Sequence, residues 1–179
     1  MITANLNVIK SDVYDEVAKT TSYEGAKAVD DDKAYERVFT TDADRAMLDR
    51  FWDEACNIAT DTMKRFITTV SSSVTINNNS SKDQPQKEPV TVDGYHAVLS
   101  LSSAYDNNLT PSIEKSLRSF FVNAIISKWD KFANKDNVKS YEDDANVALD
   151  DIVKKMFYRK RPQRTPPTQK KPDKNDNNE

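Results

Sequence analysis

The sequence predicts a mainly α-helical fold: a helical bundle of about four helices with a small β-hairpin or ribbon insertion and a disordered C-terminal tail. Apolar residues recur at helical spacing in three long stretches. A polar segment containing proline interrupts them and is flanked by short runs that alternate apolar and polar residues. Residues 162–179 contain four prolines and neither an aromatic nor an aliphatic residue. We therefore expect one domain over 1–161, with the ribbon at about 71–102, and a basic, proline-rich tail over 162–179.

The first helix is expected from about Asn7 to Ala28. Val13 and Val17 lie four residues apart in this stretch and share a helix face. Three consecutive acids at 30–32 follow and predict a solvated turn.

A second, longer helix is expected to begin near Thr41. A hydroxyl side chain caps free helix amides, and the acids at 42 and 44 complement the helix dipole. Apolar residues then recur every three or four positions: Leu48, Trp52, Ala55, Ala59, Met63, Phe66 and Val70. This pattern predicts one amphipathic helix of about 28 residues with a broad apolar face.

From Ser71 the pattern changes to that of a small ribbon. Residues 74–76 have high β propensity and lead into a polar loop at 77–85. Apolar residues then alternate with others; they are Val90, Val92, Tyr95, Ala97, Leu99 and Leu101. We expect a hairpin that projects from the helical body, with 74–76 as a third strand.

Two further helices complete the predicted domain. Thr110 and Pro111 combine a capping hydroxyl with a proline at the first helical position. The buried face of that helix is predicted to consist of Ile113, Leu117, Phe120, Phe121, Ala124, Ile125 and Trp129. The last helix is expected to start near Ser140 and to end at Pro162, with basic residues at its C-terminal end.

The composition argues against most enzyme chemistries. The chain has two glycines, and phosphate-binding loops need several of them close together. One cysteine and one histidine exclude an internal disulfide and a metal site built from several Cys or His ligands. No stretch has the length and apolarity of a membrane span, and the N-terminus lacks the features of a signal peptide. We expect no enzyme activity, no cofactor and no membrane association.

Individual reactive residues have simpler structural interpretations. His96 is interpreted as a strand or surface residue. A histidine that acts as a general base needs a nucleophile and an orienting acid, and the sequence indicates neither of them near His96. Cys56 lies beside the apolar stripe and is interpreted as a small packing residue. Acid pairs, such as Asp49 with Asp53, are interpreted as solvated helix faces rather than cation ligands. A metal-dependent enzyme that uses these acids remains the third alternative.

Two sets of residues are candidates for contact with partners. The basic residues of the C-terminal region are expected to dock on an acidic protein surface or to touch phosphates loosely: Arg159, Lys160, Arg161, Arg164, Lys170 and Lys171. From 159 to 179 the chain has seven bases and three acids, a net charge of +4. Apolar residues of the long helix and the ribbon are candidates for an interface between copies: Phe51, Trp52, Val74, Ile76, Leu99 and Leu101.

The order of elements resembles a known family. The segments are DADRAMLDRFWDEACNIATDTMKRFITT from Asp42, a loop and ribbon, TPSIEKSLRSFFVNAIISKWDKF from Thr110, and VALDDIVKKMFYRKRP from Val147. Together they resemble the head–tail connector, or adaptor, proteins of tailed bacteriophages. The resemblance implies a structural virion protein of the phage neck that forms a dodecameric ring below the portal. The portal and other neck or tail proteins would be its partners, and DNA would pass through the ring without sequence-specific binding.

An alternative function remains open from the sequence. A cytoplasmic helical interaction or regulatory module would also combine an acidic body with a basic tail, and that tail would bind nucleic acid or an acidic partner. The adaptor is expected to form rings or to assemble on a portal. The regulatory module is expected to be monomeric and to bind DNA in a salt-dependent way.

Overall fold

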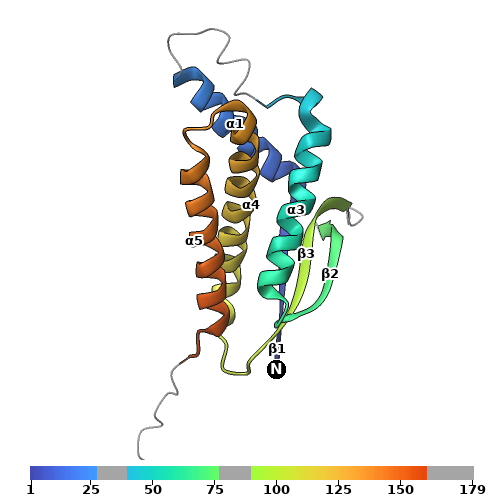
Figure 1. Cartoon of the computed structure of the whole chain (residues 1–179). Coiled ribbons are helices and arrows are strands. Elements are labelled where there is room, and N and C mark those ends of the chain that lie inside the picture. The colour runs from blue at the N-terminus through green and yellow to red at the C-terminus, as the bar shows by residue number, and fades with distance from the viewer. Residues whose placement is uncertain (28–39, 77–89, 161–179) are drawn as a thin grey trace, which may run out of the picture.

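The computed structural model describes residues 1–27, 40–76 and 90–160, and in these ranges it is mainly α-helical with a small antiparallel sheet (Figure 1). In chain order the elements are β1 (Ile2–Ile9), α1 (Lys10–Lys27), η1 (Asp42–Asp44), α3 (Arg45–Met63), β2 (Ile67–Ile76), β3 (Val90–Leu101), η2 (Asn107–Leu109), α4 (Thr110–Ala133) and α5 (Val138–Phe157). Within these ranges the prediction of about four helices with a small β element is confirmed. The third strand of the sheet is the N-terminal β1, whereas residues 74–76, which were expected to form it, are part of β2. The predicted acidic turn at 30–32, the loop at 77–85 and the tail at 162–179 lie outside the described residues.

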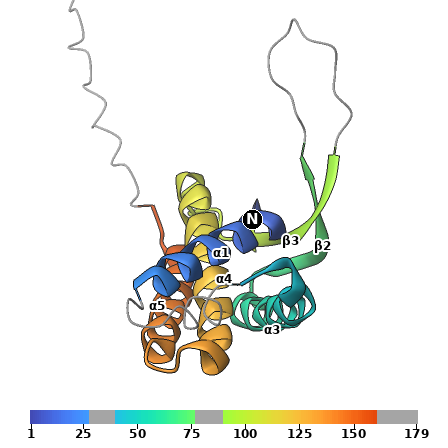
Figure 2. The ribbon, with the colours of Figure 1, turned by 90° about the horizontal axis from the view of Figure 1, so that it is seen from above.

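The three strands form one antiparallel sheet in the order β1-β3-β2. β1 pairs with β3 from Ile2 opposite Leu101 to Ile9 opposite Gly94. β2 also pairs with β3 and continues past the end of β1 as far as Ile76 opposite Val90. The outer part of the sheet is therefore a two-stranded ribbon that extends from the body (Figure 2).

β1 corrects the prediction of a first helix that begins near Asn7. Ala4, Leu6 and Val8 are buried, and the residues between them are exposed. This two-residue period places one face of a strand on the core, so the chain is extended up to Ile9 and becomes helical only at Lys10.

The long second helix ends earlier than predicted. α3 stops at Met63, a turn follows in which the Phe66 amide donates to the Met63 carbonyl at 2.8 Å, and β2 starts at Ile67. The stretch from Ile67 to Val70 is rich in β-branched residues, which favour a strand, and it pairs with the inner part of β3. Phe66 and Val70 therefore do not belong to a helix face.

α4 and α5 match their predictions closely. α4 begins at Thr110 with a proline in its first turn, and α5 begins at Val138, joined to α4 by a short connection. α5 ends at Phe157 rather than at Pro162, and Tyr158 is extended with φ −61° and ψ 136°. The two helices lie side by side with α3, while α1 crosses α4 near its C-terminal end (Figures 1 and 2).

An aromatic group forms the centre of the core. The ring of Phe121 stacks on Trp52, with centroids 4.6 Å apart, and lies 5.4 Å from the ring of Tyr95. Tyr14 meets Trp52 edge to face at 6.3 Å. These contacts join α1, α3, β3 and α4, so one hydrophobic cluster holds the helices on the sheet.

Candidate interaction surfaces

The residues considered for catalysis are separated in space and engaged in structural contacts. His96 lies on the sheet face opposite the core, with Nδ1 2.6 Å from Oδ1 of Asn7 on the neighbouring strand. Burial raises the pKa of the Cys56 thiol to about 12, so the thiol is protonated at neutral pH. Within the described residues no three His, Cys, Asp or Glu side chains gather as metal ligands, and no helix has the length and apolarity to cross a bilayer.

A polar cluster between α4 and α5 was not anticipated from the sequence. The Ser116 hydroxyl donates to Oδ2 of Asp151 at 2.6 Å, and Nζ of Lys155 lies 2.9 Å from the same hydroxyl and pairs with Asp151. Partial burial acts to raise the pKa of Asp151, but the hydrogen bonds from Lys155 and Ser116 outweigh it and hold that pKa below its usual value. The lysine is thus paired with an ionised carboxylate. The cluster links α4 to α5.

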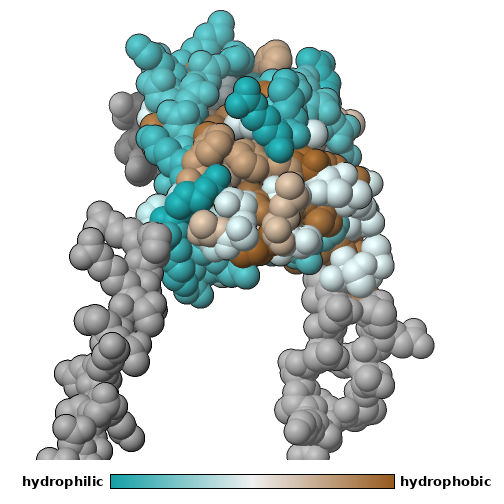
Figure 3. Space-filling model, turned by 90° about the horizontal axis from the view of Figure 1, so that it is seen from below, coloured by the Kyte–Doolittle hydropathy of each residue, from teal (hydrophilic) through white to brown (hydrophobic). Residues whose placement is uncertain are grey.

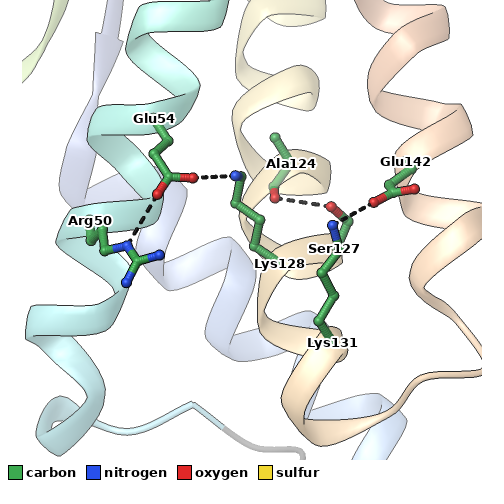
Figure 4. Close-up of polar contacts among 7 residues, drawn as sticks. All are labelled: Arg50, Glu54, Ala124, Ser127, Lys128, Lys131 and Glu142. Atoms are coloured by element: carbon green, nitrogen blue, oxygen red, sulfur yellow. Dashed lines mark hydrogen bonds and ion pairs between the residues drawn. The ribbon is translucent and has the colours of Figure 1, made fainter.

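Ion pairs also connect the helix surfaces of α3, α4 and α5 (Figure 4). Glu54 of α3 accepts from Arg50 at 3.1 Å and pairs with Lys128 of α4. Lys131, one turn further along α4, pairs with Glu142 of α5 at 2.8 Å. The hydrogen bond from Lys128 lowers the pKa of Glu54, so this acid is charged at neutral pH. These acids neutralise bases of the same chain.

The apolar residues predicted to contact other copies lie mostly inside the chain's own core. Relative exposure is 4% at Phe51 and Trp52, 3% at Val74, 0% at Leu99 and 1% at Leu101. The prediction that these five side chains offer a surface to other copies was therefore wrong. The apolar face of α3 is covered by α1, α4 and the sheet, which the sequence pattern does not reveal. The side chain of the sixth candidate, Ile76, lies outside the described part of the structure.

A different apolar surface is exposed at the end of the body where α3 and α5 finish. We call it the underside patch; it comprises Met1, Ile2, Phe66, Ile67 and Phe157. Met1 is 99% and Phe157 50% exposed, and the others are partly buried. The ring of Phe66 lies 5.1 Å from that of Phe157. Figure 3 shows apolar side chains gathered on this end of the molecule.

Hydrogen bonds join the N-terminus to the rest of the underside patch. The Ser100 hydroxyl donates to the sulfur of Met1 at 3.1 Å, and the Ser100 amide donates to the Phe66 carbonyl at 2.7 Å. Ser100 of β3 therefore links the N-terminus to the turn after α3. Exposed apolar surface of this kind is typical of sites that contact other proteins.

The two described basic residues of the C-terminal candidate set, Arg159 and Lys160, follow directly after α5. The Lys160 amide donates to the Ala104 carbonyl at 2.9 Å, and its Nζ lies 3.3 Å from Oδ1 of Asp106. Arg159 is exposed and contacts the Met156 carbonyl at 3.5 Å. The structure thus fixes Lys160 against the segment between β3 and α4. The remaining candidates, Arg161, Arg164, Lys170 and Lys171, lie outside the described residues.

The ribbon and residues 158–160 extend toward the same side of the body (Figure 2). The outer part of the ribbon pairs Ser73 with Asp93 and Ile76 with Val90, and Val90 is 50% exposed. Isolated two-stranded ribbons are marginally stable in water, so an extended ribbon that exposes Val90 suits contact with another protein.

Comparisons with known proteins add no relative. No protein-family model, no curated protein and no solved structure matches the chain.

Proposed function

We propose that the protein is a structural component of the neck of a tailed bacteriophage, a connector that forms a ring below the portal. In this proposal α1, α3, α4 and α5 act as a helical bundle that forms the rigid body of each subunit. The ring has about twelve copies, held by contacts between unlike faces of neighbouring subunits, and DNA passes through its centre.

The observation that carries the proposal is the projecting ribbon of β2 and β3. It extends beyond β1 from a compact helical body, in the same order of elements as in the adaptor family that the sequence resembles. A two-stranded extension gains little stability from its own pairing, so it adds little to the folding of the subunit alone. We assign it to contact with the next subunit.

The underside patch supplies a second contact surface. Met1 and Phe157 expose apolar area, and Phe157 lies three residues before Lys160, whose amide donates to the Ala104 carbonyl. We assign this end of the body to the portal or to the next ring of the neck. The basic segment that follows would reach an acidic region of the same partner.

A matched pair of variants tests this assignment. Phe157→Ser introduces a hydroxyl at the centre of the underside patch, whereas Tyr23→Ser changes an aromatic residue that is 73% exposed near the other end of the body. We expect the first variant to lose at least tenfold in affinity for the portal, because a buried apolar contact would be removed, and the second to bind as the natural protein does. Co-sedimentation with purified portal rings measures both. Equal binding by the two variants would contradict the role of the patch.

The same preparation distinguishes the proposed adaptor from the alternative, a regulatory module. An adaptor binds the portal, and its affinity for random DNA is weak. A module that acts through its basic tail binds DNA with an affinity that falls steeply with salt and leaves the portal unbound.

A further inference from the structure

Two carboxyl groups are buried together where α1, α4 and α5 meet. Asp130, near the C-terminal end of α4, is 0% exposed. Glu24, near the end of α1, is partly buried, and its Oε2 atom is inaccessible to solvent. Both oxygens of Asp130 and Oε2 of Glu24 lack a hydrogen-bond partner within residues 1–27, 40–76 and 90–160. Buried polar atoms without a partner are rare in folded proteins and need a physical explanation.

Among the described residues, the groups around the two acids do not compensate two negative charges. From α5, the Tyr141 hydroxyl donates to Oε1 of Glu24 at 2.5 Å, and the amide of Asn137 donates to the same oxygen at 3.2 Å. Asp144 is a third acid close enough to act on Tyr141. The nearest cation of α4 in the sequence, Lys131, pairs with Glu142 of α5. None of the described ion pairs reaches Glu24 or Asp130.

We propose that Glu24 and Asp130 hold one proton between them in the folded chain, and that this carboxyl pair latches the end of α1 onto α4 and α5. Oε1 of Glu24 already accepts two hydrogen bonds, so Oε2 is the oxygen of that side chain that needs a donor. Asp130 is the protonated member, because no described donor is available to its carboxylate. A neutral acid is far less costly to bury than a second charge, and its hydroxyl supplies the donor that Oε2 of Glu24 lacks.

The latch has a defined pH dependence. Burial, followed by the charge of Glu24, raises the pKa of Asp130 to about 7 in the folded chain. The folded state therefore binds a proton that the open state releases. The stability that the latch contributes is complete below the ordinary pKa of an aspartic acid. It falls as the pH rises from there toward 7 and is lost above 7.

Hydrogen exchange of the full chain tests the proposal. We expect the equilibrium constant for opening the α1 amides near Glu24 to rise by up to tenfold per pH unit between about pH 5 and 7, and then to level off. Asp130→Asn removes the ionisation, so its opening should not depend on pH in this way, and α1 should be better protected at pH 8. Asp150→Asn, an exposed acid on α5, is the matched control and should retain the natural slope.

A second variant and a direct titration separate the proposal from a structural effect. Glu24→Gln should shift the midpoint to lower pH, because Asp130 then ionises beside a neutral group. In NMR, the carboxyl carbon of Asp130 should titrate near pH 7. Titration near pH 4, or loss of α1 protection in Asp130→Asn at every pH, would show that Asp130 is an ionised partner of a cation and would overturn the proposal.

Discussion

Truncation of Phe121 to alanine is expected to cost about 3–5 kcal/mol of folding free energy, the range for removing a fully buried phenylalanine. Phe121 is 0% exposed, stacks on Trp52 at 4.6 Å and also contacts the rings of Tyr95 and Phe120. Its loss would leave a cavity where α3, β3 and α4 meet. Equilibrium unfolding in urea, followed by tryptophan fluorescence, measures the change.

Phe132→Ala is the control for this prediction. Phe132 lies on the same helix, is 72% exposed and stacks only loosely on Phe51, with centroids 6.5 Å apart. We expect the free energy of unfolding to fall by less than about 1 kcal/mol, because folding buries little of the Phe132 side chain. If the two variants were destabilised equally, the aromatic group around Phe121 would not be the centre of the core.

Gly94→Ala is expected to destabilise the sheet by about 1–3 kcal/mol, as overpacking does in other proteins. A Cβ at this position would lie 2.4 Å from the Val8 carbonyl oxygen, 2.8 Å from Cγ2 of Val74 and 3.3 Å from Cα of Ile9. Two of these atoms are backbone, so β1 would have to move. The change lies where the three-stranded sheet becomes the two-stranded ribbon, and thermal unfolding with exchange of the β1 amides would detect it.

Ser100→Ala tests whether any substitution in β3 has this effect. Ser100 points away from the core, and its hydroxyl contacts only the sulfur of Met1 among the described residues. We expect the free energy of unfolding of this variant to stay within about 0.5 kcal/mol of that of the natural protein. A Gly94→Ala variant as stable as Ser100→Ala would mean that β1 adjusts freely at Ile9.

The helices were predictable where the pattern is unambiguous. Thr110 followed by proline marks the start of α4, and the spacing of apolar residues sets its buried face. The alternation of Ala4, Leu6 and Val8 also indicates the strand β1. The helix predicted from Val13 and Val17 was wrong at its start, because α1 begins at Lys10 and not near Asn7. The end of α3 was missed because apolar residues happen to continue the helical period into β2.

The interaction surfaces were less accessible from the sequence. An apolar stripe shows that a face is buried and not what covers it, so Trp52 was assigned to other copies although Phe121 covers it. The underside patch depends on Phe66 and Phe157, whose rings lie 5.1 Å apart and which only the fold brings together. Glu24 and Asp130 likewise belong to no motif, and only tertiary packing places their carboxyl groups together.

In the proposed function this chain assembles with copies of itself and with neck proteins. Multi-angle light scattering of the purified chain, over a range of concentrations and after addition of portal rings, measures this assembly. We expect a discrete species of about twelve chains, alone or bound to the portal. A species with the mass of one chain at every concentration, unchanged by the portal, would contradict it.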